Sequence, residues 1–295
     1  MKLTDNILRL PLEQFISRQL GHSWSVATSR DMGDYACHPA AILSDGSYSV
    51  FVKYSDAANG LHQFEVELAS LNYLAGRTGV RIPHPLGILP AGSGHILVME
   101  EVRSVERTFH RFRQMGQALA CIHKVKADTF GLETDGYFGP LPQDNSPLPD
   151  WPSFYAERRL LPGMQRAVDS GNLPASFIHP LERIIARLPS LCGPDVIPTL
   201  LHGDAQQNNF ISSEAGVYVI DPAIYYGNPE VDLAFIDYFQ PVPDDFFAGY
   251  REELPIDPGF GERRPLWRIW GYLAAVTVEG AAYLGKLQEA VEKFG

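Results

Sequence analysis

The sequence has few cysteines and no long apolar run. Its 295 residues include 3 cysteines, Cys37, Cys121 and Cys192, at wide and irregular spacing. That number and spacing fit neither a disulfide framework nor a zinc site, and they favour a reducing compartment. No stretch of roughly eighteen apolar residues occurs, so we expect no membrane-spanning helix. The opening residues, Met1 to Ile7, lack the apolar segment of a signal peptide, and we expect a cytoplasmic protein.

Basic residues are also scarce. The sequence has 24 Lys and Arg against 35 Asp and Glu, which gives a formal net charge of −11. Proteins that bind nucleic acid rely on clusters of Lys and Arg, so we expect no nucleic-acid partner. The basic run Arg103 to Arg113 fits the solvent-exposed face of a helix. An acidic surface instead favours a cationic small molecule.

What the chain does contain is the composition of a globular enzyme with a large core: 45% of its residues are hydrophobic and 20% are charged. Apolar spacing and turn residues predict helices and a hairpin early in the chain. We expect these elements: a helix over 11–21, strands over 40–43 and 48–53 joined by the turn 44–47, a helix from Phe64 to near Gly76, a strand over 95–99, a helix over 105–123, and a structured loop over 139–152.

The most informative segment places two acids and an amide close together in sequence. Asp204 and Asn209 lie in a polar turn, and Asp221 follows the next apolar run. Two short strands joined by a turn would bring all three to one end of a hairpin. In kinases an Asp accepts the proton of the attacking hydroxyl, while an Asn and a second Asp hold magnesium. Carboxylate and amide oxygens are the ligands that Mg²⁺ prefers.

Together with the block Tyr225 to Ala234, these residues resemble the fructosamine/ketosamine-3-kinase family, a branch of the aminoglycoside-phosphotransferase-like kinases. Upstream, Phe51-Val-Lys53 and Phe64 to Leu71 resemble the nucleotide-binding half of that family. The segment Phe138 to Leu160 resembles one that is peculiar to this branch. The resemblance runs from about residue 30 to the C-terminus.

The resemblance implies an α+β, two-lobed protein-kinase-like fold. We expect a small antiparallel-sheet lobe for nucleotide over residues 1–100 and a larger, mainly helical lobe for catalysis and acceptor binding over 101–295. It also implies ATP and Mg²⁺ as cofactors and a small amine-bearing sugar of the ketosamine type as substrate. Kinases for another amino-sugar, an aminoglycoside or an amino alcohol are the nearest alternative. A nucleotide-binding pseudokinase acting through a partner is another, and the oligomeric state stays open.

Residue roles follow from the matched motifs. Asp204 is the expected base, with Asn209 and Asp221 as metal ligands. Lys53 would hold phosphate and Glu67 would position Lys53, although Glu65 is a rival that points elsewhere on the helix. The resemblance also implies a hinge between the lobes that would meet adenine, formed by Met99, Glu100 and Val102.

Supporting residues are expected around this centre. His202 would order the turn, by a hydrogen bond with Asp232. Asp232 would cap a helix and, as the resemblance implies, brace the catalytic loop, since the two roles are compatible. Three tryptophans could line a sugar or amine pocket, although core packing is the more common role for any single one of them. They are Trp151, Trp267 and Trp270.

The sequence departs from the family in three places. The segment 29–37, which should cover the phosphates, has one glycine where the family has several. The loop 205–208 reads Ala-Gln-Gln-Asn in place of Leu-Trp-Ser-Gly, next to the expected acceptor site. The C-terminal helices lack the His and Asn residues that are frequent in this branch.

Overall fold

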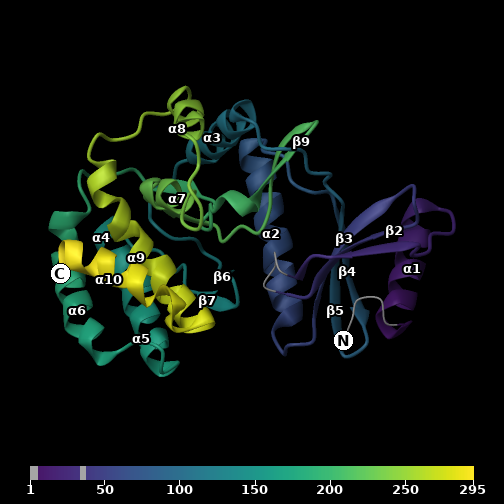
Figure 1. Ribbon diagram of the computed structural model, residues 1–295, viewed down its shortest axis with the longest axis horizontal. Coiled ribbons are helices and arrows are strands. Elements are labelled where there is room, and N and C mark those ends of the chain that lie inside the picture. The colour runs from purple at the N-terminus through teal and green to yellow at the C-terminus, as the bar shows by residue number, and fades with distance from the viewer. Residues whose placement is uncertain (1–5, 34–37) are drawn as a thin grey trace.

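The computed structural model describes residues 6–33 and 38–295 of the chain. Its first part is an antiparallel sheet that lies to one side of a helical body (Figure 1). The five strands have the order β1-β2-β3-β5-β4. Their bounds are β1 (Thr28–Asp31), β2 (Ala40–Ser44), β3 (Ser49–Ser55), β4 (Pro85–Ala91) and β5 (Gly94–Glu100). The turn predicted at 44–47 joins β2 to β3, so that hairpin is confirmed.

Side chains alternate across the two central strands, because successive residues of a strand point to opposite faces. Val52 of β3 and Val98 of β5 belong to a core cluster that also contains residues of α1 (Asn6–Leu20). Leu97 and Met99 pack instead with α2 (Gly60–Thr78) on the other face. Lys53 follows Val52, so the same alternation turns it toward α2.

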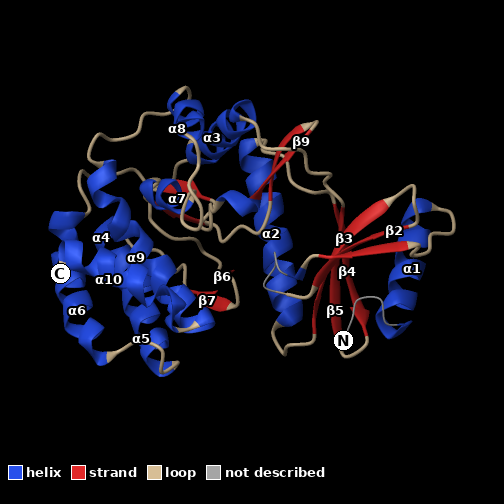
Figure 2. Cartoon of the chain, viewed as in Figure 1, coloured by secondary structure: helices blue, strands red, loops and turns tan. Residues whose placement is uncertain are grey.

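Helices make up most of the regular secondary structure after Glu100 (Figure 2). The helices are α3 (Phe109–His123), α4 (Trp151–Tyr155), α5 (Leu161–Asp169), α6 (Ile178–Leu191), α7 (Glu230–Phe235), α8 (Asp244–Arg251), α9 (Phe260–Glu279) and α10 (Leu284–Phe294). Three two-stranded sheets accompany them: β6 (Gly136–Phe138) with β7 (Leu141–Gln143), β8 (Thr199–Leu201) with β11 (Tyr225–Gly227), and β9 (Phe210–Ser213) with β10 (Gly216–Val219). None of the helices in the described ranges is long and apolar enough to cross a membrane.

Several helix and loop boundaries in the structure differ from those predicted. Helix α1 already includes Asn6, upstream of Pro11. Helix α2 continues through Gly76 and ends at Gly79, whose φ of 72° gives the left-handed cap for which glycine is suited. Helix α3 begins only after Thr108, whose side chain caps it by accepting from the Arg111 amide. The loop predicted over 139–152 contains strand β7.

Two glycines let α3 and α8 approach closely. A Cβ atom added at Gly116 would lie 2.0 Å from the Phe246 carbonyl oxygen, and one added at Gly249 would lie 2.0 Å from the Arg113 carbonyl oxygen. No side chain fits at either place. The contact matters beyond the two helices, because each of them carries one residue of a buried polar chain that leads to the candidate active site.

The substitution Gly116→Ala should therefore destabilise the fold by about 1–3 kcal/mol or more, as expected for overpacking. Gly76→Ala is the matched control: it is also helical, but nothing lies within 4 Å of its added Cβ. The control should gain roughly 0.5–1 kcal/mol from helix propensity. Urea unfolding of both variants measures the difference. Equal stability of the two variants would contradict the close packing of α3 on α8.

Candidate active site

The acids and the amide of the central motif meet at one end of a hairpin. Strands β9 and β10 pair with Phe210 opposite Val219, so the residues that flank the pair, Asn209 and Ile220, are neighbours. The Ile220 amide donates to the Asn209 carbonyl oxygen at 3.0 Å. Asp221 comes next, at the same end of the hairpin as the turn that carries Asp204.

Asn209 is oriented by Asp204. Its Nδ2 donates to the Asp204 carbonyl oxygen at 2.8 Å and to Asp204 Oδ2 at 3.0 Å. The amide nitrogen is therefore committed to Asp204, and the amide oxygen is the atom that remains for a cation. Burial raises the pKa of Asp204 to about 7, despite hydrogen bonds from Gln206 and Asn209 that favour the carboxylate.

Lys53 lies between two carboxylates. Its Nζ is 2.8 Å from Glu67 Oε1 and also contacts Asp221 Oδ1, and only 4% of the residue is exposed. Burial opposes its charge, but Asp221 and Glu67 outweigh burial and raise the pKa of the ammonium above its usual range. Desolvation opposes the charge of the half-buried Asp221, but Lys53 outweighs it and holds the pKa of this carboxyl below its usual range. Glu65 is exposed on another face of α2, so the lysine pairs with Glu67 rather than with this rival.

The backbone has a positive φ at Asp221 and at Gly203. Within the described ranges, Asp221 is the one non-glycine residue with a positive φ, at 51°. Strain of this kind persists where the surroundings hold it and is frequent at functional sites. Gly203 has a φ of 83°, and a Cβ added there would lie 1.9 Å from the Ala223 carbonyl oxygen. Only glycine permits this approach between the two segments.

Asp232 braces the catalytic turn from below. Its carboxylate accepts hydrogen bonds from the backbone amides of His202, at 2.7 Å, and Gly203, at 3.0 Å. It also pairs with His123 Nε2 at 3.0 Å, and His123 Nδ1 lies 2.8 Å from the Tyr250 hydroxyl. The helix cap at the start of α7 is Pro229, so Asp232 acts as a brace and not as a cap.

The imidazole of His202 makes different contacts from those expected. Its Nδ1 accepts from the Asp204 amide at 3.2 Å, which leaves Nε2 to donate to the Ile220 carbonyl oxygen at 2.9 Å. Burial lowers the pKa of His202, which suits a neutral ring in these two roles. The expected bond to Asp232 is thus made by the backbone of His202 and not by its side chain.

Sequence reasoning was wrong about part of the basic run. Arg107 precedes α3 and is half-buried rather than on an exposed helix face. Its guanidinium donates to the carbonyl oxygens of Gln207 and Phe210, both at 2.9 Å. His123 and Tyr250 were missed altogether. The one available signal for His123 was a polar residue at the end of an otherwise apolar helix face.

The segment peculiar to the resembling family holds the backbone just after Asp221. Gln143 Nε2 donates to the Ala223 carbonyl oxygen at 3.1 Å, and Asn145 Nδ2 donates to that of Ile224 at 3.2 Å. Arg159 is fully buried and donates to Asn145 Oδ1 at 2.8 Å. This chain of bonds gives the segment a structural reason to accompany the catalytic motif.

Two cavities open at the motif. One, of about 260 Å³, is bounded by Asp221, by the residues expected to meet adenine and by Arg30 and Met32 from the segment expected over the phosphates. The hinge residues that line it are Met99, Glu100 and Val102. The other cavity, of about 120 Å³, contains Asp204 and Gln206. Residues 34–37 of the expected phosphate segment lie outside the described residues.

The three tryptophans do not line either cavity. Trp151, Trp267 and Trp270 are at most 3% exposed and belong to the core of the helical part. Trp267 Nε1 donates to Glu230 Oε2 at 2.8 Å, inside that core. The pocket role suggested for them is therefore wrong, and core packing explains all three.

Comparison with known proteins decides the family. The family model described as fructosamine kinase matches residues 11–294. The chain belongs to the fructosamine kinase family. Within it, a ketosamine-3-kinase of Mus musculus is 28% identical over 93% of this chain and 96% of its own length. A Synechocystis protein named as a probable ketoamine kinase is 29% identical, over 96% of this chain and 95% of its own.

Structural comparison gives the same result. A Thermobifida fusca crystal structure, described as that of a "putative fructosamine-3-kinase", is 31% identical, with a TM-score of 0.82 over 96% of this chain and 97% of its own. An aminoglycoside phosphotransferase, solved with AMP-PNP and hygromycin B, is 16% identical, with a TM-score of 0.61 over 96% of this chain and 98% of its own. This second likeness shows the fold alone. The expected α+β, kinase-like fold and the family are both confirmed.

The raised pKa of Asp204 makes a prediction about stability. Folding raises its pKa from 3.8 to about 7, so the folded state binds the proton more tightly than the unfolded chain between those values. The contribution of Asp204 to stability therefore falls as pH rises through that window. Asp204→Asn should gain about 1–2 kcal/mol over the wild type at pH 8, after discounting for solvent screening, and much less at pH 5. Urea unfolding at both pH values tests this; a gain that is the same at pH 5 and pH 8 would contradict it.

Proposed function

We propose that this chain transfers the γ-phosphoryl group of ATP to a hydroxyl of a small ketosamine. The nucleotide would lie between a lobe of residues 1–100 and a lobe of residues 101–295. The observation that carries the proposal is the meeting of Asp204, Asn209 and Asp221 at one hairpin end, beside the buried pair of Lys53 and Glu67. That set has the composition that phosphoryl transfer requires.

The donor set fits a magnesium ion. Asn209 Oδ1 and the Asp221 carboxylate are hard oxygen ligands, and Mg²⁺ typically takes one or two carboxylates with phosphates and water supplying the rest. Within the described ranges no group of three or more His, Cys, Asp and Glu side chains converges on one point, in keeping with so small a protein contribution. Bound there, the ion would neutralise charge on the phosphates.

Each of the other residues of the site has its own role in the transfer. Asp204 accepts the proton of the acceptor hydroxyl, and a pKa of about 7 suits a base that works near neutral pH. Lys53 donates to phosphate oxygens, and Glu67 holds its ammonium in place. The hinge Met99, Glu100 and Val102 lines the cavity expected to take adenine. His202 and Asp232 fix the turn that carries the base.

The alternative acceptors retain one observation in their favour. Gln206 lines the cavity beside Asp204 and belongs to the loop that departs from the family. An acceptor of one of the alternative classes, an aminoglycoside, another amino-sugar or an amino alcohol, would contact the site at Gln206. The pseudokinase alternative is weakened, because Lys53, Asp204, Asn209 and Asp221 are all present and are brought together.

A substrate screen tests the proposal. With Mg²⁺ and ATP, kcat/KM for a ribulosamine or a fructosamine should exceed that for an aminoglycoside or choline by at least about tenfold, which is roughly 1.4 kcal/mol in transition-state binding. Asp204→Asn should lower turnover about 10²- to 10⁴-fold, because it removes the base. Asp195→Asn, which removes the same charge from an exposed loop, is the matched control and should leave turnover unchanged.

An aminoglycoside or choline in first place would give the function to the alternative acceptors. Equal turnover of Asp204→Asn and the control would remove the proposed base.

A further inference from the structure

The cavity that holds Asp204 has an apolar floor and a carboxylate at its outer end. Phe138, Phe235 and Tyr238 form part of its wall, together with Ala274 from α9. Glu279, the last residue of α9, also lines it. Asp204 is half-buried and Glu279 is exposed, so the cavity runs from the catalytic turn outward to solvent.

Large apolar side chains flank Glu279 at this opening. Phe239 is 40% exposed and Val278 is 51% exposed, and both line the cavity. Exposed apolar groups beside a polar one are frequent at ligand sites. Within the described ranges Glu279 forms no ion pair, unlike the Glu230 carboxylate, which is paired with Arg263. It lies beside Tyr283, and together burial and this carboxylate raise the pKa of the Tyr283 phenol.

Tyr238 connects the inner and outer ends. Its hydroxyl is buried without a hydrogen-bond partner. Burial raises the pKa of the phenol, and the charges of Asp204 and Glu279 add to the effect. Asp204, Tyr238 and Glu279 all line this one cavity. A ligand with its hydroxyl at Asp204 can thus extend along the wall that contains Tyr238 and reach Glu279.

We propose that Glu279, Phe239 and Val278 form an amine-recognition rim: Glu279 pairs with the ammonium of the acceptor, and Phe239 and Val278 contact the apolar substituent on its nitrogen. This assignment rests on the proposed function. A ketoamine carries a secondary amine that is cationic near neutral pH, so its charge complements this carboxylate. The rim selects ketoamines of apolar amines and disfavours those of acidic amino acids, whose additional carboxylate would face Glu279.

Calorimetric titration of a matched ligand pair tests the rim. The pair is 1-benzylamino-1-deoxyfructose and 1-O-benzylfructose, which is close in shape but has no positive charge. The wild type should bind the amine about fivefold more tightly than the ether, as expected for an exposed ion pair. The Glu279→Gln variant should bind the amine and the ether equally tightly, with the affinity for the ether unchanged. Phe239→Ser should weaken both ligands alike, because both carry the benzyl group.

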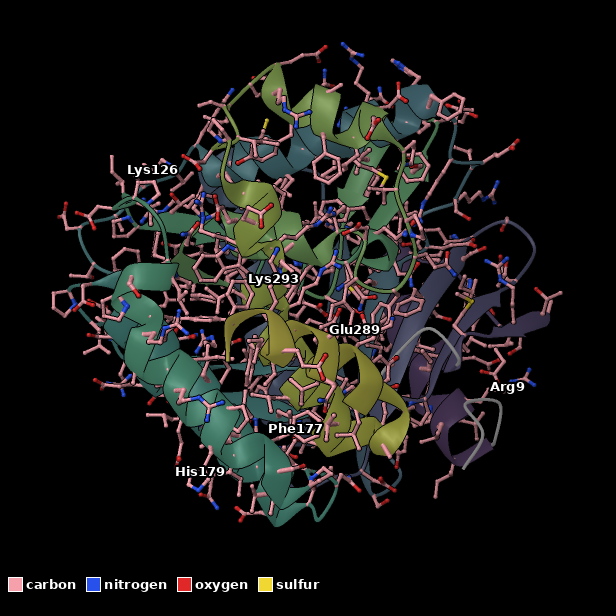
Figure 3. All side chains as sticks on the ribbon, turned by 60° about the vertical axis from the view of Figure 1, so that its left-hand side comes forward. Arg9, Lys126, Phe177, His179, Glu289 and Lys293 are labelled. Atoms are coloured by element: carbon pink, nitrogen blue, oxygen red, sulfur yellow. The ribbon has the colours of Figure 1, made fainter. Side chains whose placement is uncertain are left out.

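Glu289→Gln is the control for net charge. Glu289 lies on α10 of the same helical body (Figure 3) and is exposed. It is absent from the cavity lining. The Glu289→Gln substitution removes the same charge and should keep the amine-to-ether affinity ratio of the wild type. A ratio that survives in Glu279→Gln, or that falls equally in Glu289→Gln, would overturn the rim.

Phosphorylation assays on the same ligands separate the two proposals. Amine binding that depends on Glu279, without any phosphorylation in the presence of Mg²⁺ and ATP, would overturn the proposed function and keep the recognition by the rim. Phosphorylation with a ratio that is insensitive to Glu279 would overturn the rim alone. Absence of both binding and phosphorylation for the wild type would overturn both.

Discussion

The ammonium of Lys53, held between Glu67 and Asp221, is the contact on which the rest of the site depends. It joins three elements that are distant in sequence: strand β3, helix α2 and the hairpin that ends at Asp221. Burying charge is costly unless each charge is paired, and removing one partner leaves the others uncompensated. The alternation of β3 explains its position, since Val52 enters the core under α1 while Lys53 faces α2.

The catalytic turn is held mainly through its backbone, and from several sides. Asp232 accepts from two of its amides, and Arg107 donates to carbonyl oxygens of Gln207 and Phe210. Asp232 pairs with His123 of α3, which in turn contacts Tyr250 of α8. These are the two helices that pack closely at Gly116 and Gly249. Such contacts fix the backbone that carries Asp204 and Asn209, which is the arrangement required for a preorganised site.

Local patterns in the sequence were sufficient for part of this description. The match to the helix of the resembling family favoured Glu67 over Glu65, and two short strands joined by a turn placed Asp221 at the hairpin end near Asp204. The boundary of α2 was misplaced because Gly76 and Gly79 look alike in sequence, and only the left-handed backbone at Gly79 distinguishes them. Contacts between distant segments were beyond reach, since nothing in the run Arg103 to Arg113 indicates that Arg107 would turn inward.

The tryptophans show the same limit. A large aromatic residue in a sequence fits a packed core more often than a ligand pocket, and only the position of its neighbours decides between them. In this fold Trp267 and Trp270 face the interior, whereas smaller residues of the same helix, such as Ala274, line the cavity beside Asp204. The acceptor site is therefore built from residues that, taken singly in the sequence, do not indicate a ligand site.

The most direct test of the central claim is a crystal structure with Mn²⁺ and AMP-PNP, with the metal located by its anomalous scattering. The account predicts a metal peak within about 2.3 Å of an Asp221 carboxylate oxygen and of Asn209 Oδ1, distances typical of a hard cation bound by oxygen. Lys53 should donate to a phosphate oxygen while it keeps its contact with Glu67. A metal held by other side chains, or a phosphate chain away from Lys53, would contradict the account.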